Sequence, residues 1–239
     1  MPNSVAAETS PAPTRASTYS GYYQKPSTGP DRYLTQVGRG TPGGEYLRRF
    51  WQPVAYLDEL GELPLRVRVL GEDLVVFRDL SGRIGALHLQ CCHRNASLEY
   101  GVVEEGGLRC CYHGRLFDVD GAILEMPGEP DWFKDSADLR QGAYPTHLFG
   151  GIVFIYMGPP EKVPVFPMYD RFSIPGVRLV PGPRWELKCN WLQLQENVLD
   201  PAHTATLHAI PQLRGMDHFA AEFGSFPDLI TWSDTPGGF

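Results

Sequence analysis

Four residues of the types that bind metals, in two short runs, are the feature that most constrains this chain. Cys91 and His93 form the first pair, Cys110 and His113 form the second, and sixteen residues separate the pairs. Thiolates and imidazoles at these spacings can share one metal centre only if both runs lie on neighbouring loops. Glycines within and just after the stretch favour tight connections. The pattern therefore predicts two loop tips, each contributing one Cys and one His.

The order of these ligands separates two kinds of metal centre. A structural zinc site can use two Cys and two His, but zinc fingers usually pair Cys with Cys and His with His along the chain. A [2Fe–2S] cluster of the Rieske type places two thiolates on one iron and two imidazoles on the other. The alternation Cys91, His93, Cys110, His113 favours this cluster. A zinc-stabilised binding module is the alternative that the pattern leaves open.

The residues around the ligands resemble the Rieske domain of aromatic-ring-hydroxylating oxygenases. The likeness lies in Cys-Cys-His-Arg from Cys91, in the Ala-Ser-Leu that follows, and in Cys-Cys-Tyr-His-Gly from Cys110. Many members of that family have Trp after His-Gly, where this chain has Arg115. We expect Cys92 and Cys111, each beside a ligand cysteine, to be small buried or half-buried loop residues.

The composition excludes several other classes of protein. The chain has 239 residues, with 42% hydrophobic and 21% charged residues, which is ordinary for a globular protein. Its net charge of −7 and its lack of a basic run argue against nucleic acid as a partner. We expect no membrane span and no secretory signal, because no apolar stretch is long enough. Five cysteines, an odd number, argue against a disulfide framework and favour the cytoplasm.

The chain divides into three expected parts. Residues 1–30 are rich in Ser, Thr, Pro and Ala and predict a disordered tail. Residues 31–160 predict the Rieske domain, opened by a helix from Thr41-Pro42 to Phe50. Residues 161–239 predict the first part of a catalytic domain, after a Pro-rich linker. The expected fold is thus an all-β Rieske domain with antiparallel strands, followed by the start of an α+β domain.

Short strands between Gly and Pro turns carry the β prediction. Gly71-Glu72-Asp73 predicts a turn between the first two strands. Strands are expected over residues 65–70, 74–77, 84–89, 116–118, 151–156 and, near the end of the chain, 229–232.

A second group of candidate metal ligands follows the linker. Asp200 before Pro201 predicts the cap of a helix that carries His203 and His208. Two histidines and a carboxylate leave open positions on a non-haem Fe(II), an arrangement that activates O₂. The spacing of five residues is not the same-face spacing of three or four, so a π-type turn would be needed to bring the two rings together. By spacing alone, this pair is weak evidence.

The sequence from Glu196 to His208 resembles the mononuclear iron motif of the same oxygenases. The resemblance implies that His203 and His208 bind Fe(II). It also implies that Asp200 joins the two metals, bridging the Rieske histidine His113 of a neighbouring subunit to an iron-bound histidine. The family's third iron ligand, an Asp or Glu, is expected downstream of Phe239. Acidic residues before that point do not match the ligand position; they are Asp217, Asp228 and Asp234.

These resemblances imply the function of an oxygenase large subunit, closest to the phthalate-dioxygenase and O-demethylase branch. Electrons would come from NAD(P)H through a separate reductase to the cluster and then to Fe(II), where O₂ is activated to hydroxylate or O-demethylate a small aromatic compound. A homotrimer is the expected assembly. We expect the 239-residue chain to be truncated and inactive alone. The alternative is a Rieske-type electron carrier without oxygenase activity.

Overall fold

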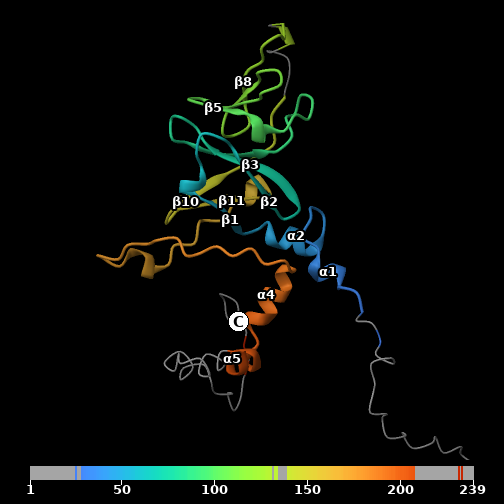
Figure 1. The fold of residues 1–239 in the computed structure, drawn as a ribbon, viewed down its shortest axis with the longest axis vertical. Coiled ribbons are helices and arrows are strands. Elements are labelled where there is room, and N and C mark those ends of the chain that lie inside the picture. The colour runs from blue at the N-terminus through green and yellow to red at the C-terminus, as the bar shows by residue number, and fades with distance from the viewer. Residues whose placement is uncertain are drawn as a thin grey trace, which may run out of the picture. The chain divides into compact units, whose positions relative to one another are not determined.

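Three antiparallel sheets form the core of the computed structural model, which describes residues 25, 28–130, 132–133, 139–207, 231 and 233. All the elements belong to one compact unit, residues 32–239, and residues 1–31 form a separate unit. The first sheet has the order β1-β11-β10, the second β2-β3-β4-β9, and the third β5-β6-β7-β8 (Figure 1). The antiparallel β prediction is confirmed.

The strands within the described residues are short and lie before residue 157. Their bounds are β1 Trp51–Tyr56, β2 Leu65–Val69, β3 Glu72–Arg78, β4 Ile84–His88, β5 Val102–Glu104, β6 Gly107–Arg109, β7 Leu116–Phe117, β8 Ile123–Glu125, β9 Ala143–Tyr144, β10 Thr146–Phe149 and β11 Ile152–Tyr156.

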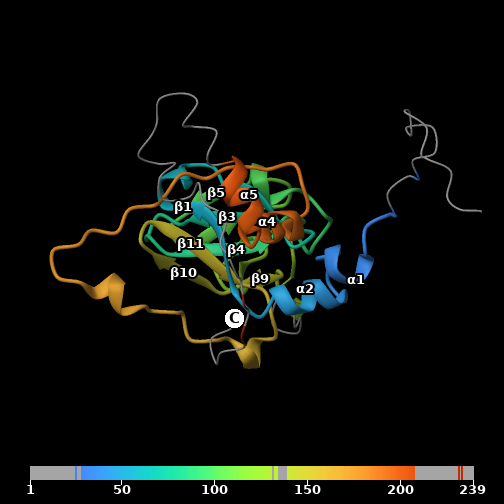
Figure 2. The ribbon, with the colours of Figure 1, turned by 90° about the horizontal axis from the view of Figure 1, so that it is seen from below.

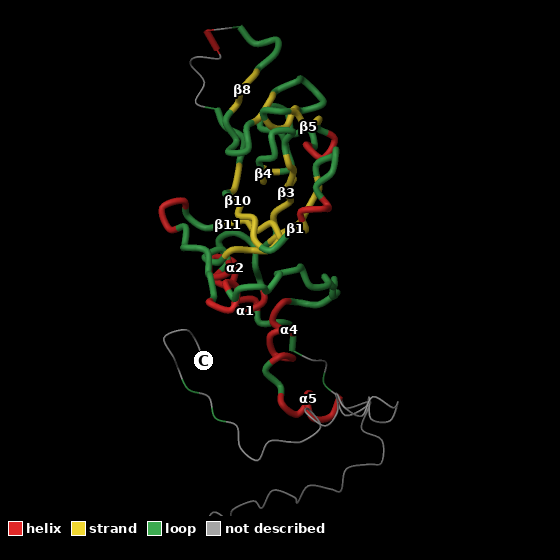
Figure 3. Tube along the Cα trace, turned by 90° about the vertical axis from the view of Figure 1, so that its left-hand side faces the viewer, coloured by secondary structure: helices red, strands yellow, loops and turns green. Residues whose placement is uncertain are grey.

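Helices lie near both ends of the described residues between 28 and 207, and residues 132–133 are also helical (Figure 3). Their bounds are α1 Arg32–Thr35, α2 Pro42–Leu47, α4 Trp191–Val198 and α5 Pro201–Leu207, with short 3₁₀ turns at η2 Leu57–Glu59, η3 Leu98–Tyr100, η4 Pro160–Lys162 and η5 Asp170–Ser173. No helix within the described residues is long and apolar enough to cross a membrane. The strand expected over residues 229–232 falls outside a continuous described segment.

The second sheet is the middle layer of the domain, because β3 is buried on both faces and lies between β5 on one side and β1, β10 and β11 on the other (Figure 1). Figure 2 views the same sheets from below, along this stack. Successive side chains of a strand point to opposite sides. Val75 and Phe77 pack into a core shared with the third sheet, whereas Leu74 and Val76 pack into a core shared with the first sheet. This double burial explains why β3 carries a continuous apolar run instead of an alternating pattern.

The hairpin between β2 and β3 corrects one predicted turn. Leu70 and Gly71 alone connect the strands, with φ angles of 47° and 82°. Positive φ at both central residues is the geometry of a type I′ turn, whose twist matches that of the flanking strands. Glu72 and Asp73 therefore begin β3, opposite Val69 and Arg68, and the turn lies earlier than the sequence predicted.

The opening helix is capped as expected but is shorter than predicted. The Thr41 hydroxyl accepts a hydrogen bond from the Gly44 amide at 3.1 Å, and Pro42 occupies the first turn. The helix ends at Leu47 instead of Phe50, because the amide of Phe50 bonds three residues back and β1 begins at the next residue.

The Pro-rich connection after β11 is held against the first sheet. The Trp51 indole donates to the Pro164 carbonyl at 3.1 Å, and Phe166 stacks on His147 with ring centroids 4.1 Å apart. Farther along, the Tyr56 hydroxyl donates to the Gly182 carbonyl at 2.6 Å. The predicted linker is thus an extended segment that packs on the domain.

A partly buried charge network joins α2 to the middle sheet. The carboxylate of Glu72 accepts hydrogen bonds from Arg48 at 2.7 Å and from the Tyr144 hydroxyl at 2.6 Å, and Arg39 donates to the same hydroxyl. Burial alone would raise the pKa of Glu72. The hydrogen bonds from Tyr144 and Arg48 and the charges of Arg39 and Arg48 outweigh burial, so the pKa is lowered.

Glu72→Gln should lower the free energy of unfolding by about 1.5–3 kcal/mol at neutral pH, because Arg48 loses a charged partner inside the domain. Since the folded pKa lies below the unfolded value, this contribution is present above the unfolded pKa of about 4.3 and is lost as pH falls through the folded pKa. Urea unfolding of both proteins against pH measures the difference. Glu105→Gln, at an exposed position, is the matched control. A difference that stays constant into acid pH would contradict the argument.

Candidate metal centre

The two predicted ligand loops close with the same hydrogen bonds. In the first, the Cys91 amide donates to the Ala96 carbonyl at 2.8 Å, and the Asn95 amide donates to the Cys91 carbonyl at 2.9 Å. In the second, the Cys110 amide donates to the carbonyl five residues on at 2.8 Å, and the Gly114 amide donates to the Cys110 carbonyl at 3.0 Å. Each loop is thus the same turn built on a cysteine.

A left-handed residue ends each of these turns. Asn95 has a φ of 56° and Gly114 a φ of 71°, and each lies four residues after its cysteine. Gly adopts this conformation without steric cost, and Asn tolerates it better than most residues do. The shared turn explains the sequence on both sides, although the ligand histidine follows its cysteine by two residues in the first loop and by three in the second.

Cys91 and Cys110 are both part of the domain core. Each is 2% exposed, and both belong to the cluster of buried side chains that contains Leu98 and Phe117. The sequence places them at the ends of strands that feed into this core, so the two thiols lie together and away from water. Such burial suits the inner iron of a cluster, where thiolate ligands need protection from solvent.

His93 and His113 lie side by side nearer the surface. Their ring centroids are 4.6 Å apart at an interplanar angle of 64°, close enough for one nitrogen of each ring to reach a single iron at about 2 Å. His93 Nδ1 is buried without a hydrogen-bond partner, which is unfavourable unless a ligand completes it. Tyr112 packs on the His113 ring at 3.8 Å. The donor set fits an iron with two imidazoles.

The arrangement also tests the zinc alternative. Among the residues that the structure describes, no three His, Cys, Asp or Glu side chains are placed to hold one metal ion. A structural zinc needs about four ligands on one ion. Two separate pairs, one of thiols and one of imidazoles, fit a two-iron cluster.

Burial shifts the pKa values of three predicted ligands toward their neutral forms. The pKa of Cys91 is raised by its hydrogen bond with Cys92 and by burial, and the pKa of Cys110 is raised mainly by burial. The pKa of His93 is lowered by burial and then by the charge of Arg115. His93 is therefore held in the neutral form that binds metal, whereas both thiols must release a proton when a metal binds.

The expectation that Cys92 and Cys111 are buried or half-buried is wrong, because both are exposed. Each follows a ligand cysteine that faces the core and lies within the turn that the ligand loop forms. The pKa of Cys92 is lowered to about 6 by a hydrogen bond from Cys91, against the effect of burial, and by Arg115. Exposure still makes it a poor ligand for a centre whose other thiol, Cys110, is in the core.

Gln141 is a buried residue that holds the first loop by hydrogen bonds, and the sequence did not predict this role. Its side-chain oxygen accepts the Cys92 amide at 2.8 Å, and its nitrogen donates to the carbonyls of His88 and Gln90 at 2.9 Å each. It is 2% exposed. The contact spans about fifty positions of sequence, so only the folded chain shows it.

Arg115 is buried beside the centre at the position where many oxygenases have Trp. Its side chain is 5% exposed and donates to Glu129 at 3.0 Å. A turn with Gly128 at a φ of 82° presents Glu129, whose amide bonds the Met126 carbonyl. Where many family members have Trp, this chain thus has an arginine that forms an ion pair with Glu129.

The second predicted constellation lies only partly within the described residues. The Asp200 carboxylate accepts the amides of Ala202 at 2.9 Å and His203 at 3.1 Å, so it caps α5 as predicted. His203 is half-buried on that helix. His208 lies outside the described residues, as do the three acidic residues considered for the third ligand. The predicted iron site and the bridging role of Asp200 stay predictions.

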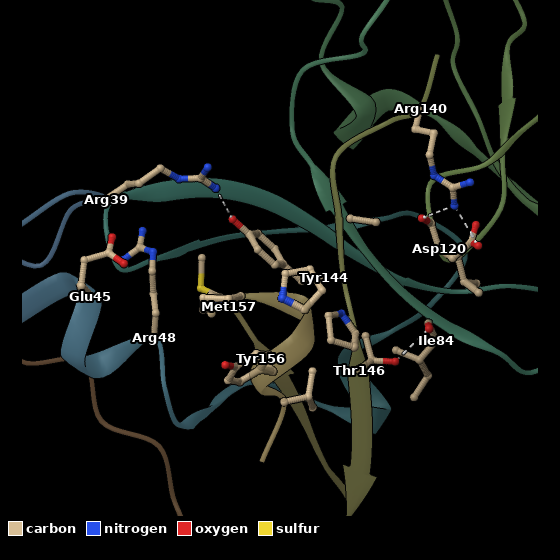
Figure 4. Close-up of a pocket in the computed structure, with 17 residues that line it drawn as sticks. Arg39, Glu45, Arg48, Ile84, Asp120, Arg140, Tyr144, Thr146, Tyr156 and Met157 are labelled. Atoms are coloured by element: carbon tan, nitrogen blue, oxygen red, sulfur yellow. Dashed lines mark hydrogen bonds and ion pairs between the residues drawn. The ribbon is translucent and has the colours of Figure 1, made fainter. Parts of the chain in front are cut away.

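A cavity of about 950 Å³ lies between α2, β9, β10 and the chain after β11 (Figure 4). Arg39, Tyr144, Arg140 and Thr146 are among the residues on its walls. Arg39 bonds Tyr144, and Arg140 bonds Asp120 at 2.9 Å. None of the described residues that line it belongs to either ligand loop.

Comparison with known proteins agrees with the geometry of the loops. Residues 50–146 match the family described as the Rieske [2Fe-2S] domain. The tert-butanol monooxygenase / tert-amyl alcohol desaturase oxygenase subunit of Aquincola tertiaricarbonis is 48% identical over 210 residues, covering 84% of this chain and 44% of that protein. The phthalate 4,5-dioxygenase oxygenase subunit of Pseudomonas putida is 41% identical over 181 residues, covering 74% and 40%.

A solved structure shares the fold. Dicamba monooxygenase bound to dicamba superposes with a TM-score of 0.52 and 30% identity, covering 64% of this chain and 49% of that chain. The chain spans less than half the length of these relatives. Its loops and its matches agree, and the chain belongs to the Rieske aromatic-ring-hydroxylating oxygenase alpha subunits of the phthalate-dioxygenase and O-demethylase-like branch.

Proposed function

We propose that this chain is the cluster-bearing part of an oxygenase that hydroxylates or O-demethylates a small aromatic compound. The observation that carries the proposal is the pairing of two buried thiols with two imidazoles whose rings are 4.6 Å apart. The proposed ligands of the [2Fe–2S] cluster are Cys91, His93, Cys110 and His113, and those of a mononuclear Fe(II) are His203 and His208.

The cluster supplies one-electron transfer at a potential that imidazole ligation raises above that of an all-thiolate ferredoxin. The chain's own residues set its surroundings. Cys91 and Cys110 hold their side of the site inside the core, where Leu98 and Phe117 exclude water. His113 is exposed and offers a contact for an electron-transfer partner. Gln141 fixes the first loop through three backbone groups.

The rest of the proposed system follows from the relatives, two of which are named as oxygenase subunits. Such subunits need an electron source, and we assign that role to a separate NAD(P)H-dependent reductase. The full-length protein would be a homotrimer in which Asp200 of one subunit meets His113 of the next. In this proposal residues 31–160 form the Rieske domain and residues 161–239 begin the catalytic domain. Five free thiols fit a reducing cytoplasm.

The purified chain should contain iron and acid-labile sulfide and, once reduced, give the electron paramagnetic resonance signal of mixed Cys/His ligation. Cys91→Ser and His113→Ala should abolish or change that signal, because each removes a ligand. Cys92→Ser and Cys111→Ser are the matched controls and should keep it, since both side chains face solvent. Stoichiometric zinc without sulfide would refute the cluster. Loss of the signal in either control would show that the ligand cysteines are misassigned.

In a chain extended to the length of its relatives, Asp200→Asn should keep both metals and slow oxidation of the reduced cluster by O₂ at least tenfold. An amide cannot act as the charged acceptor between two imidazole N–H groups. Asn is also a good helix cap, so α5 should persist. Stopped-flow absorbance of the cluster with substrate bound measures the rate. An unchanged rate would limit Asp200 to capping, and a carrier without its own oxygenase activity would show no substrate-dependent oxidation in any variant.

A further inference from the structure

The ion pair of Arg115 and Glu129 is an unusual neighbour for a cluster that changes charge. Arg115 is buried, and its backbone carbonyl closes the second ligand loop by accepting the Cys110 amide. Its guanidinium reaches across to the first loop, where it contacts the thiol of Cys92. The side chain therefore lies between the two loops, two positions from His113 and next to the residue that follows Cys91.

Glu129 brings the opposite charge to the same place. It comes from the turn after β8, 28% exposed, and holds Arg115 at 3.0 Å. Besides burial, the charge of Arg115 lowers the pKa of His93 and that of Glu129 raises it; the exposed Arg94 next to His93 also lowers it. The pair has no net charge, but its two ends contribute separately to the field at the site. Because Arg115 is buried, water screens its charge less than that of an exposed cation.

We propose that this ion pair tunes the reduction potential of the cluster, with the buried Arg115 cation stabilising the reduced form and the Glu129 carboxylate opposing it. The inference rests on the proposed function, since it requires the cluster in these loops. Reduction adds one electron, supplied by the reductase, and so adds one negative charge to the cluster. A fixed cation beside the loops favours that change, and a fixed anion disfavours it.

The experiment measures the reduction potential of the loaded chain by redox titration followed by electron paramagnetic resonance. Arg115→Gln should disfavour reduction about tenfold, which for a one-electron couple is about 59 mV downward. Glu129→Gln should raise the potential. The double variant should return close to the wild-type value, because it removes both charges. Arg115→Lys, which keeps the charge, should also stay close to wild type.

Arg78→Gln is the matched control for the change of Arg to Gln. Arg78 is exposed at the end of β3 and pairs with Ile84, the start of the strand whose other end leads to Cys91. Solvent therefore screens its charge, and the potential should move less than twofold in equilibrium constant. If Arg115→Gln does not retain the cluster, Glu129→Gln still shows whether removal of the negative charge raises the reduction potential. Arg115→Lys then shows whether a positive charge at this position is enough to keep the wild-type potential.

Opposite shifts in the two single variants, cancelling in the double variant, would establish an electrostatic role. Shifts of the same sign, or a double variant displaced as far as either single one, would overturn the inference and leave the pair as a structural contact. Iron and sulfide are measured in every sample, so absence of a cluster from the wild-type chain would refute the proposed function, whereas an intact cluster with an unmoved potential would refute only this inference.

Discussion

The burial of two cysteines in the domain core is the constraint on which the rest of this structure depends. Cys91 and Cys110 share one hydrophobic cluster with residues of the second and third sheets. Two polar, metal-binding thiols can be held there only if neighbouring loops return at the same depth. The repeated turn, closed each time by the cysteine's own amide and carbonyl, achieves this. The middle sheet, buried on both faces, positions the first loop by way of β4.

This arrangement joins metal binding to folding. The two buried thiols have raised pKa values, so they keep their protons until metal binding displaces these protons to solvent. The histidines contribute less to the core than the cysteines do, since His113 is exposed. The thiols therefore lie on the core side of the site, and the imidazoles lie on the side nearer the surface.

Much of this could be predicted from sequence because the signals are local. Each ligand pair, each strand and the caps at Thr41 and Asp200 are signalled by residues within a few positions of one another. The missed features are contacts between distant positions. Gln141 reaches the first loop, and Arg115 pairs with Glu129, only after the chain has folded. A local signal for α4 existed in its Asn190 cap, whose side chain accepts the Leu192 amide at 3.1 Å.

The one-residue offset between the two ligand loops has a consequence of its own. The turns match, but the second histidine comes one position later after its cysteine, so the two imidazoles do not share an environment. His93 is shielded, with a buried ring nitrogen, while His113 is exposed under Tyr112. Two ligands of one iron would thus differ in their access to the outside. If the proposed cluster forms, His113 would be the ligand that a partner can reach, and this asymmetry would follow from the one-residue difference in spacing.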